Sequence, residues 1–451
     1  MTTVVIGGGE NSIAQDKHIT DMYVMSTCAI TIKTGALIDL QSVLQEILIY
    51  EDMFSPSITG SIRIQDMAGG HEKFILTGGE KITLRISRAD GKEVIITRND
   101  LVVYEISKMK VDNQNSVSYE LRFTTEAAIK SHKKRIFKSF GTERNLTNII
   151  KKIYADISNV DRLFINAPTS FGAVTQNAFV CPGYNPIEAI QFLAKRACVN
   201  GQYYVFFERV NTSVVVGQLY NHYFLNVKDL KAYFNNLSIP KLKVKPTTSY
   251  ITGVSEADLQ IKSYQIQQNF NHMTAMTQGY YNSNIKTIDL LTRAVNNKKV
   301  NYTKRGVEQL DDLYKNRYMD SFNTFNQYDA TQQPGERLIV APKGDIISNK
   351  AEWILQDLYG AITNSAIRLI IEIAGGNNKI GVGNVVDVDI PSIANKVVSQ
   401  TSSQIVSDAV YSGKYMVTAV KHIITRTSYI KRLEVSRGTF KFDIDQLIAL
   451  S

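Results

Sequence analysis

The chain has 451 residues, of which 44% are hydrophobic and 21% are charged. This composition is ordinary for folded protein and argues against disorder, while the length predicts two to four domains of about 100 to 200 residues each. No apolar run is long enough for a membrane-spanning helix, and the N-terminus lacks the basic segment of a secretory signal, so we expect a protein made in the cytoplasm. The formal charge of +9 permits a polyanionic partner but does not require one.

Residues 1–24 are predicted to be a flexible arm. The glycines at 7–9 are followed by polar residues with no sustained period. A phosphate-binding loop is the alternative, but it needs a strand before the glycines and a helix directly after them. We therefore interpret this segment as a linker.

Residues 25–128 are predicted to form a small antiparallel β-barrel. The segment SITGSIRIQD alternates cleanly, with Ile58, Ile62 and Ile64 facing inward, and Gly60 indicates a close approach of two backbones. The segment VLQEILIYE is apolar on both sides, which favours a central strand. Further alternating strands are expected at Ile82, Leu84 and Ile86, at Val102, Tyr104 and Ile106, and at Tyr119, Leu121 and Phe123.

Residues 129–245 change to a helical period and predict an α/β middle domain. Over 143–157, apolar residues recur at spacings of three and four, as on one face of a helix. A second helix is expected to start with Asn185 as its cap and Pro186 in its first turn. The segment YYVFFE that follows predicts a strand.

Residues 246–290 and 366–437 are predicted to form a second antiparallel barrel. Residues 291–365 form an insertion with a helix near 349–362, 392–409 form an added contact loop, and 438–451 form a tail. The strand patterns on which this rests are the following. Val386, Val388 and Ile390 alternate with Asp387 and Asp389, Tyr415, Val417 and Ala419 alternate with Met416, Thr418 and Val420, and Leu433 and Val435 alternate with Arg432 and Glu434.

The stretch from Lys130 to Arg144 is the densest in basic residues and includes two phenylalanines. Clustered cations with aromatic residues among them can bind nucleic acid. A solvated helix face followed by a linker explains the same pattern, and we adopt that interpretation. The prediction is therefore that these cations face solvent.

Signals for catalysis or metal binding are weak. Asp387 and Asp389 share a strand face and could form a carboxylate pair, but alternation on a solvent-facing strand explains them as well. Cys181 with Pro182, and Glu208, resemble reactive groups, but no His or Asp partner is recognisable nearby in sequence. The six histidines and three cysteines show neither HxxxH nor CxxC spacing, so the thiols are expected to be reduced and buried: His18, His71, His132, His222, His272 and His422, and Cys28, Cys181 and Cys198. We predict no catalytic, cofactor-binding or metal-binding residues.

Four groups of sequence segments follow one another in an order that matches a known family. They are IYEDMFSPSITGSIRIQD, then LVVYEISKMK with SVSYELRFTTEAAI, then FVCPGYNPIEAIQFLAKRACVNGQYYVFFERV, and finally NNKIGVGNVVDVDIP with SGKYMVTAVKHIITRTSYIKRLEVSR. In this order they resemble the baseplate hub proteins of contractile-tailed bacteriophages of the T-even type, which are related to the N-terminal half of type VI secretion spike proteins. The resemblance implies an α+β fold with two tube-like barrels, an α/β middle domain and an insertion.

The same resemblance implies a function. It implies a trimeric, pseudo-sixfold ring in the virion tail baseplate that joins the sixfold tail tube to the threefold central spike around a channel. Expected partners are the spike, the tail tube protein and the wedge proteins of the baseplate, with the tape measure protein as a further candidate, and neither a membrane, a cofactor nor a specific nucleic acid. The alternatives are a cell-wall hydrolase of the tail tip, a basic nucleic-acid-binding protein, and the hub of a related contractile injection system.

Overall fold

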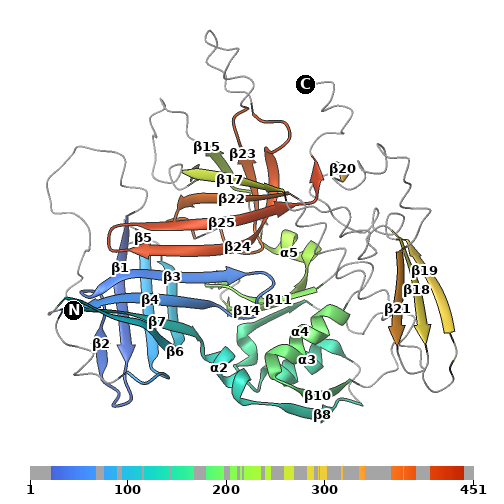
Figure 1. Cartoon of the computed structure of the whole chain (residues 1–451), viewed down its shortest axis with the longest axis horizontal. Helices are drawn as coiled ribbons and strands as arrows, with labels where there is room; N and C mark the ends of the chain where they lie inside the picture. The colour runs from blue at the N-terminus through green and yellow to red at the C-terminus, as the bar shows by residue number, and fades with distance from the viewer. Residues whose placement is uncertain are drawn as a thin grey trace, which may run out of the picture.

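The structure is a computed structural model of the chain (Figure 1). It describes residues 22–67, 76–88, 94–113, 116–141, 145–166, 179–197, 204–210, 214–215, 218–234, 239–244, 259–268, 282–288, 293, 295–301, 316–317, 335–340, 367–378, 380–392 and 407–440. The glycines at 7–9, the helix predicted at 349–362 and most of the loop predicted at 392–409 lie outside these residues.

A run of seven strands forms what we call the N-terminal unit, residues 23–125. The strands are β1 (Tyr23–Thr31), β2 (Leu37–Asp39), β3 (Leu44–Asp52), β4 (Thr59–Asp66), β5 (Lys81–Arg88), β6 (Val94–Asn113) and β7 (Ser116–Thr125). They pair in the order β2-β1-β5-β6-β7-β4-β3, and every pair is antiparallel. Apolar residues from both ends of this path share one core, so the sheet curls around it.

The pattern of β4 is confirmed in detail. Ile58, Ile62 and Ile64 are buried. A Cβ atom at Gly60 would lie 2.3 Å from the Phe123 ring and 2.4 Å from the carbonyl oxygen of Leu48. Because real Cβ atoms do not approach other atoms so closely, only glycine fits between these two strands.

The face predicted for β6 is wrong at Tyr104 and right at Ile106, which packs against the core of the N-terminal unit. Leu101 and Val103 are buried, whereas Tyr104 is 48% exposed. The pairing with β7 shifts register between Val103 and Glu105, where a β-bulge inserts one residue. Because a bulge breaks the period of two, the inward face changes at this point.

Residues 126–234 form the middle region. Its helices are α2 (Glu126–Lys133), α3 (Leu146–Tyr154), α4 (Pro186–Arg196) and α5 (Val227–Phe234), with the 3-10 turn η1 (Val160–Arg162). Its strands are β8 (Ile136–Ser139), β9 (Leu163–Asn166), β10 (Val180–Tyr184), β11 (Tyr204–Glu208), β12 (Val214–Val215), β13 (Gln218–Leu219) and β14 (His222–Asn226). The predicted helix features are confirmed, since Asn185 and Glu188 form a capping box at the start of α4 and the apolar stripe of α3 is buried.

The sheet β11-β14-β9 explains why the segment YVFFE has no polar face. Tyr204 and Phe206 pack with α3 and α4, whereas Val205 and Phe207 pack against the C-terminal part of the chain. A strand covered on both sides is apolar at every position rather than at alternate ones. The middle region therefore shares one of its two cores with the last strands of the chain.

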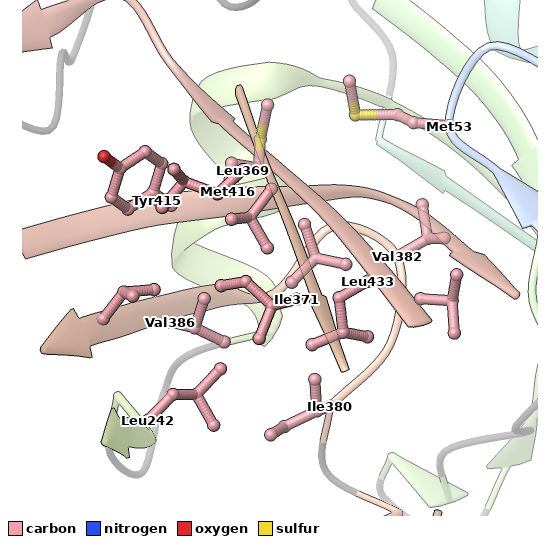
Figure 2. Packing of buried hydrophobic residues seen from close by; sticks show 14 of the residues in the cluster. Met53, Leu242, Leu369, Ile371, Ile380, Val382, Val386, Tyr415, Met416 and Leu433 are labelled. Carbon is pink, nitrogen blue, oxygen red and sulfur yellow. The ribbon is translucent and has the colours of Figure 1, made fainter. Parts of the chain in front are cut away.

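Those last strands form the C-terminal unit. It consists of β15 (Lys241–Val244), β16 (Gln260–Ile261), β17 (Ser263–Gln268), β22 (Ile367–Ala374), β23 (Val385–Asp389), β24 (Gly413–Thr425) and β25 (Tyr429–Arg437). The path β17-β22-β25-β24-β23-β15-β16 returns to β17 through Lys262, whose N–H donates to the carbonyl of Glu372 at 2.8 Å. This circuit encloses the core in Figure 2.

Two details of the C-terminal unit differ from the predicted antiparallel barrel. β15 pairs in parallel with both β16 and β23. In β24, Ala419 is half-buried while Val420 is buried, because the register shifts between Val417 and Ala419 and reverses the faces. Leu433 and Val435 lie in the core as predicted.

Two further small sheets lie outside the two units. β18 (Asn282–Ile288) pairs with β19 (Val295–Asn301) and β21 (Gly335–Val340), and β20 (Asn316–Arg317) pairs with β26 (Thr439–Phe440). The prediction that β18 belongs to the second barrel is wrong, because its pairing partners are the strands of the predicted insertion. β15, in turn, lies inside the range predicted for the middle domain, yet it pairs within the C-terminal unit.

The two units join edge to edge. The second half of β24 pairs antiparallel with β3, from Ala419 opposite Asp52 to Thr425 opposite Glu46. Strand β3 therefore lies between β4 and β24, which confirms its central position. The strands β17, β22, β25, β24, β3, β4 and β7 are stacked in one continuous sheet across the molecule (Figure 1).

Candidate functional site: buried ionic clusters at the junctions

Glu208, the last residue of β11, lies fully buried against the N-terminal unit. Its Oε1 accepts a hydrogen bond of 2.5 Å from Nη2 of Arg98, and its Oε2 accepts one of 3.0 Å from Oγ1 of Thr125. The N–H of Ile58 donates to Oε2 at 3.2 Å, and Nε2 of His222 lies 3.6 Å from the same oxygen. A buried carboxylate is tolerated when a cation and further donors surround it, so Glu208 ties the middle region to the N-terminal unit.

Arg98 completes this first cluster. Its Nε and Nη2 donate to the two carboxylate oxygens of Asp100 at 2.8 and 2.9 Å, and its Nη1 donates to the carbonyl of Arg209 at 3.0 Å. Burial opposes the charge of Arg98, but Glu208 and Asp100 outweigh burial, and the pKa of Arg98 is raised. The guanidinium therefore stays charged.

Arg209 follows Glu208 in the chain but reaches toward the C-terminal unit. Its Nη2 donates to Oδ1 of Asn384 at 3.0 Å, and its guanidinium carbon lies 4.1 Å from the centre of the Phe234 ring. A Cβ atom at Gly381 would lie 2.3 Å from Nη2, so the guanidinium occupies the space that a larger residue would need. Two consecutive residues thus contact two different units, as opposite side-chain directions at a strand end allow.

A second cluster lies where β3 and β24 pair. Nε2 of His422 and Oε1 of Glu51 are 2.6 Å apart, and Nδ1 of His422 lies 2.7 Å from the hydroxyl of Tyr429. The Tyr23 ring meets the Tyr429 ring edge to face, with centroids 6.3 Å apart. Side chains from both units therefore meet around one imidazole.

The protonation state of this cluster follows from its surroundings. Burial lowers the pKa of His422, Glu51 acts to raise it, and Lys431 adds to the lowering. Burial acts to raise the pKa of Glu51, but the hydrogen bond from His422 and the charge of Arg209 outweigh it, and that pKa is lowered. We assign a neutral imidazole whose Nε2–H donates to the ionised Glu51 and whose Nδ1 accepts from the Tyr429 hydroxyl.

His222 has a similar environment in the first cluster. Its Nδ1 lies 2.9 Å from the Tyr154 hydroxyl, and burial lowers its pKa, with Glu208 acting in the opposite direction. Both imidazoles thus lie between a tyrosine and a glutamate. All these side chains are almost entirely buried, so the geometry suits them to holding the units together.

The residues singled out in the sequence are mostly dispersed. Asp387 and Asp389 are half-buried on β23, and Oδ1 of Asp389 accepts a hydrogen bond of 2.5 Å from Ser407. Cys181 and Cys28 are buried free thiols, as predicted. Glu208 does have the histidine partner that the sequence did not reveal, because His222 approaches it through the pairing of β11 with β14.

The basic stretch from Lys130 to Arg144 covers α2 and β8. Lys130 pairs with Glu126, Lys134 with Asp156 at 2.6 Å, and Arg135 with Glu188 at 3.2 Å. These pairs are exposed or half-buried, which agrees with the predicted solvated face. Arg144 lies outside the described residues.

Among the described residues, no three His, Cys, Asp or Glu side chains are grouped as metal ligands would be. Of the helices that the structure describes, none has the length and apolar character needed to cross a membrane.

Arg98, Glu51 and the roles of both buried histidines were not predicted from the sequence. A signal was present, since His222 and Glu208 each end or begin an otherwise apolar strand segment. What the sequence could not supply was the partner, because Arg98 and Glu208 come from distant strands.

The fold is shared with two solved tail proteins. One is the 43 kDa tail protein of prophage MuSo2 from Shewanella oneidensis, with a TM-score of 0.52 and 11% identity, covering 91% of this chain and 98% of that chain. The other is a tail protein from Neisseria meningitidis MC58, with a TM-score of 0.52 and 10% identity, covering 93% and 98%. No protein-family model matches the sequence, and no curated protein sequence matches it.

Proposed function

We propose that this chain is a structural subunit of a phage tail, located in the baseplate and acting as its hub. The observation that carries the proposal is the shared fold, because the overlap with two tail proteins covers almost the whole of each chain. The order of the sequence phrases supports the same assignment independently. A hub subunit of this kind acts by its shape and by the contacts it makes with other tail proteins, and it catalyses no reaction.

The proposed assembly is a trimer in which each chain contributes two tube-like barrels to a pseudo-sixfold ring. The edge-to-edge junction of the N-terminal and C-terminal units supports this, because it already sets two β units side by side within one chain. Such a ring matches a sixfold tube on one side and a threefold spike on the other. The central spike, the tail tube protein and the wedge proteins are the proposed partners, and the tape measure protein is a further one.

Native mass spectrometry of the full chain bound to the spike protein of the same tail tests the proposal. Three copies of the chain per complex are expected. Any other stoichiometry would refute the ring. A chain that stays monomeric without the spike would not, because the spike supplies the threefold axis.

A cell-wall hydrolase is the rival function. Glu208 resembles a reactive carboxylate in the sequence, but its buried position favours a structural role over catalysis at that residue. A zymogram of the purified chain on peptidoglycan distinguishes the two, and a cleared band would overturn the structural assignment. The hub of a related contractile injection system would give the same result as a phage hub in both experiments, and an image of the assembled particle separates them.

A further inference from the structure

The N-terminal and C-terminal units repeat one plan of strand pairing. β6 pairs with β7 as β24 pairs with β25, and β7 pairs with β4 as β25 pairs with β22. β5 then pairs with the first half of β6 as β23 pairs with the first half of β24. Finally β3 pairs with β4 as β17 pairs with β22. Strand for strand, β17 is therefore the counterpart of β3, and β6 that of β24.

The register of the two plans agrees to the residue near the bulges. In β24, the register shifts between Val417 and Ala419, opposite consecutive residues of β25. In β6, the first of three shifts against β7 lies between Val103 and Glu105, again opposite consecutive residues of β7, and the correspondence extends to Ser107, where the second shift begins. Counting onward from the bulge makes Ser107 the counterpart of Lys421. Counting along β3 and β17 from their pairings with β4 and β22 makes Gln267 the counterpart of Tyr50.

The plans differ at one edge. Beyond its bulge, β24 has β3 on the edge opposite β25. Beyond its bulge, β6 pairs with β7 alone among the described residues. Met109 and Val111 on this part of β6 are 59% and 69% exposed. A strand edge with exposed apolar side chains is a ready template for another strand.

Strand β17, the counterpart of β3, also has one edge without a strand partner among the described residues. Within the described part of the chain, β17 pairs only with β22, whereas β3 is paired on both edges. Ile266 on β17 is 37% exposed. The two edges that have no strand partner among the described residues are thus the counterparts of the two edges that meet inside the chain.

From this correspondence we infer that β17 of a second copy of this chain pairs antiparallel with β6 beyond Glu105. The register copies the internal junction, so Ser107 lies opposite Gln267 of the second copy, as Lys421 lies opposite Tyr50 within the chain. The contact is head to tail, since one copy offers β6 and the next offers β17, and such contacts close into a ring when the rotation allows. The inference rests on the proposed hub function, and it names the contact from which the ring is built.

Disulfide trapping with the full chain tests the pairing. Two single variants, Ser107→Cys and Gln267→Cys, are mixed and oxidised, and non-reducing electrophoresis should show a covalent dimer that neither variant forms alone. Directly opposite residues of paired strands lie within the Cα separation that a disulfide spans. The matched positive control is the double variant Tyr50→Cys with Lys421→Cys, which should close its disulfide inside one chain. The matched negative control mixes Gln267→Cys with Ser26→Cys, an exposed position on β1.

Each outcome decides something. If the positive control forms its disulfide while the mixed pair stays uncross-linked, or if Ser107→Cys links to itself, the strand pairing is refuted. Three copies per complex without the cross-link would refute this contact and leave the hub proposal standing. A chain carrying both Ser107→Cys and Gln267→Cys should give covalent trimers. An open ladder or another closed number would support the pairing but refute the three-copy hub.

Discussion

Two junctions hold the units together by different means. Between the N-terminal and C-terminal units, β3 and β24 pair through their backbones along their whole contact. Between the N-terminal unit and the middle region, the carboxylate of Glu208 gathers donors from Arg98 and Thr125. The first junction is spread over many main-chain hydrogen bonds. The second rests on a few buried side chains centred on Glu208, including Arg98, which also donates to the carbonyl of Arg209. Substitutions should therefore affect the two junctions unequally.

Glu208→Ala should have the largest effect, because it leaves the charge of Arg98 buried without its main partner. Removing one member of a buried ion pair costs about 3 to 5 kcal/mol of unfolding free energy. Urea denaturation followed by circular dichroism measures this loss. Arg135→Ala is the control, since its pair with Glu188 is exposed and its loss is expected to change stability by at most about 1 kcal/mol. Equal effects of the two substitutions would show that the Glu208 cluster is not the anchor described here.

Glu51→Gln tests the strand junction and should be milder. The amide keeps an oxygen that can accept from Nε2 of His422, and the pairing of β3 with β24 does not depend on this side chain. Replacing a hydrogen bond to a charged group by one between neutral groups should lower stability by about 1 to 2 kcal/mol. The same denaturation experiment applies, and a loss as large as that of Glu208→Ala would contradict the contrast between the junctions.

Acid should weaken both junctions. The folded chain holds the pKa of His222 and of His422 below the ordinary value of 6.5, whereas the unfolded chain protonates both near that value. The contribution of the two neutral histidines to the unfolding free energy is therefore fully present above pH 7. It falls as the pH drops below about 6.5, by up to about 1.4 kcal/mol per pH unit for each histidine. Denaturation curves between pH 7 and pH 5 measure this slope.

His422→Gln should reduce that slope and so sharpen the comparison. The remaining slope then reports His222 and the junction of the middle region. If the slope is unchanged in this variant, His422 is not neutral in the folded chain and the assigned protonation state is wrong.

Lys421→Ala should have the smallest effect. Nζ of Lys421 lies 5.4 Å from the centre of the Tyr50 ring across the strand junction. Cation–π contacts at exposed sites contribute about 0.5 to 1 kcal/mol. A shift of the melting temperature larger than that of Glu51→Gln would mean that side chains, not the backbone, dominate this junction.

The sequence predicts those parts of the fold that depend on neighbouring residues. The inward positions of β4, the stripe of α3 and the cap at Asn185 follow from periods and local hydrogen bonds, which neighbouring residues determine. The faces of β6 and β24 changed at bulges near Tyr104 and Thr418, and a single inserted residue leaves no mark in the hydrophobic pattern. Alternation therefore gave the correct inward face on only one side of each bulge, before it in β24 and beyond it in β6.

The ionic clusters lay beyond prediction for a different reason. Arg98 and Glu208 are 110 residues apart in the chain, and the sequence around either residue does not identify the other as its partner. Only the meeting of β6 with the end of β11 makes them partners. The sequence indicates that a charged residue lies in an apolar segment, but it does not identify the distant residue of opposite charge that pairs with it.

The pairing of β3 with β24 also has a consequence for synthesis. Glu51 and His422, which meet at this junction, are 371 residues apart. At a translation rate of about 10 residues per second, β24 is synthesised on the order of half a minute after β3. During that time a nascent chain exposes a complete strand edge, which is a template for wrong pairing with another nascent chain. Three acidic residues on β3, Glu46, Glu51 and Asp52, hinder such pairing by repelling a second copy of the same edge. One of these three, Glu51, also contacts His422 in the finished junction.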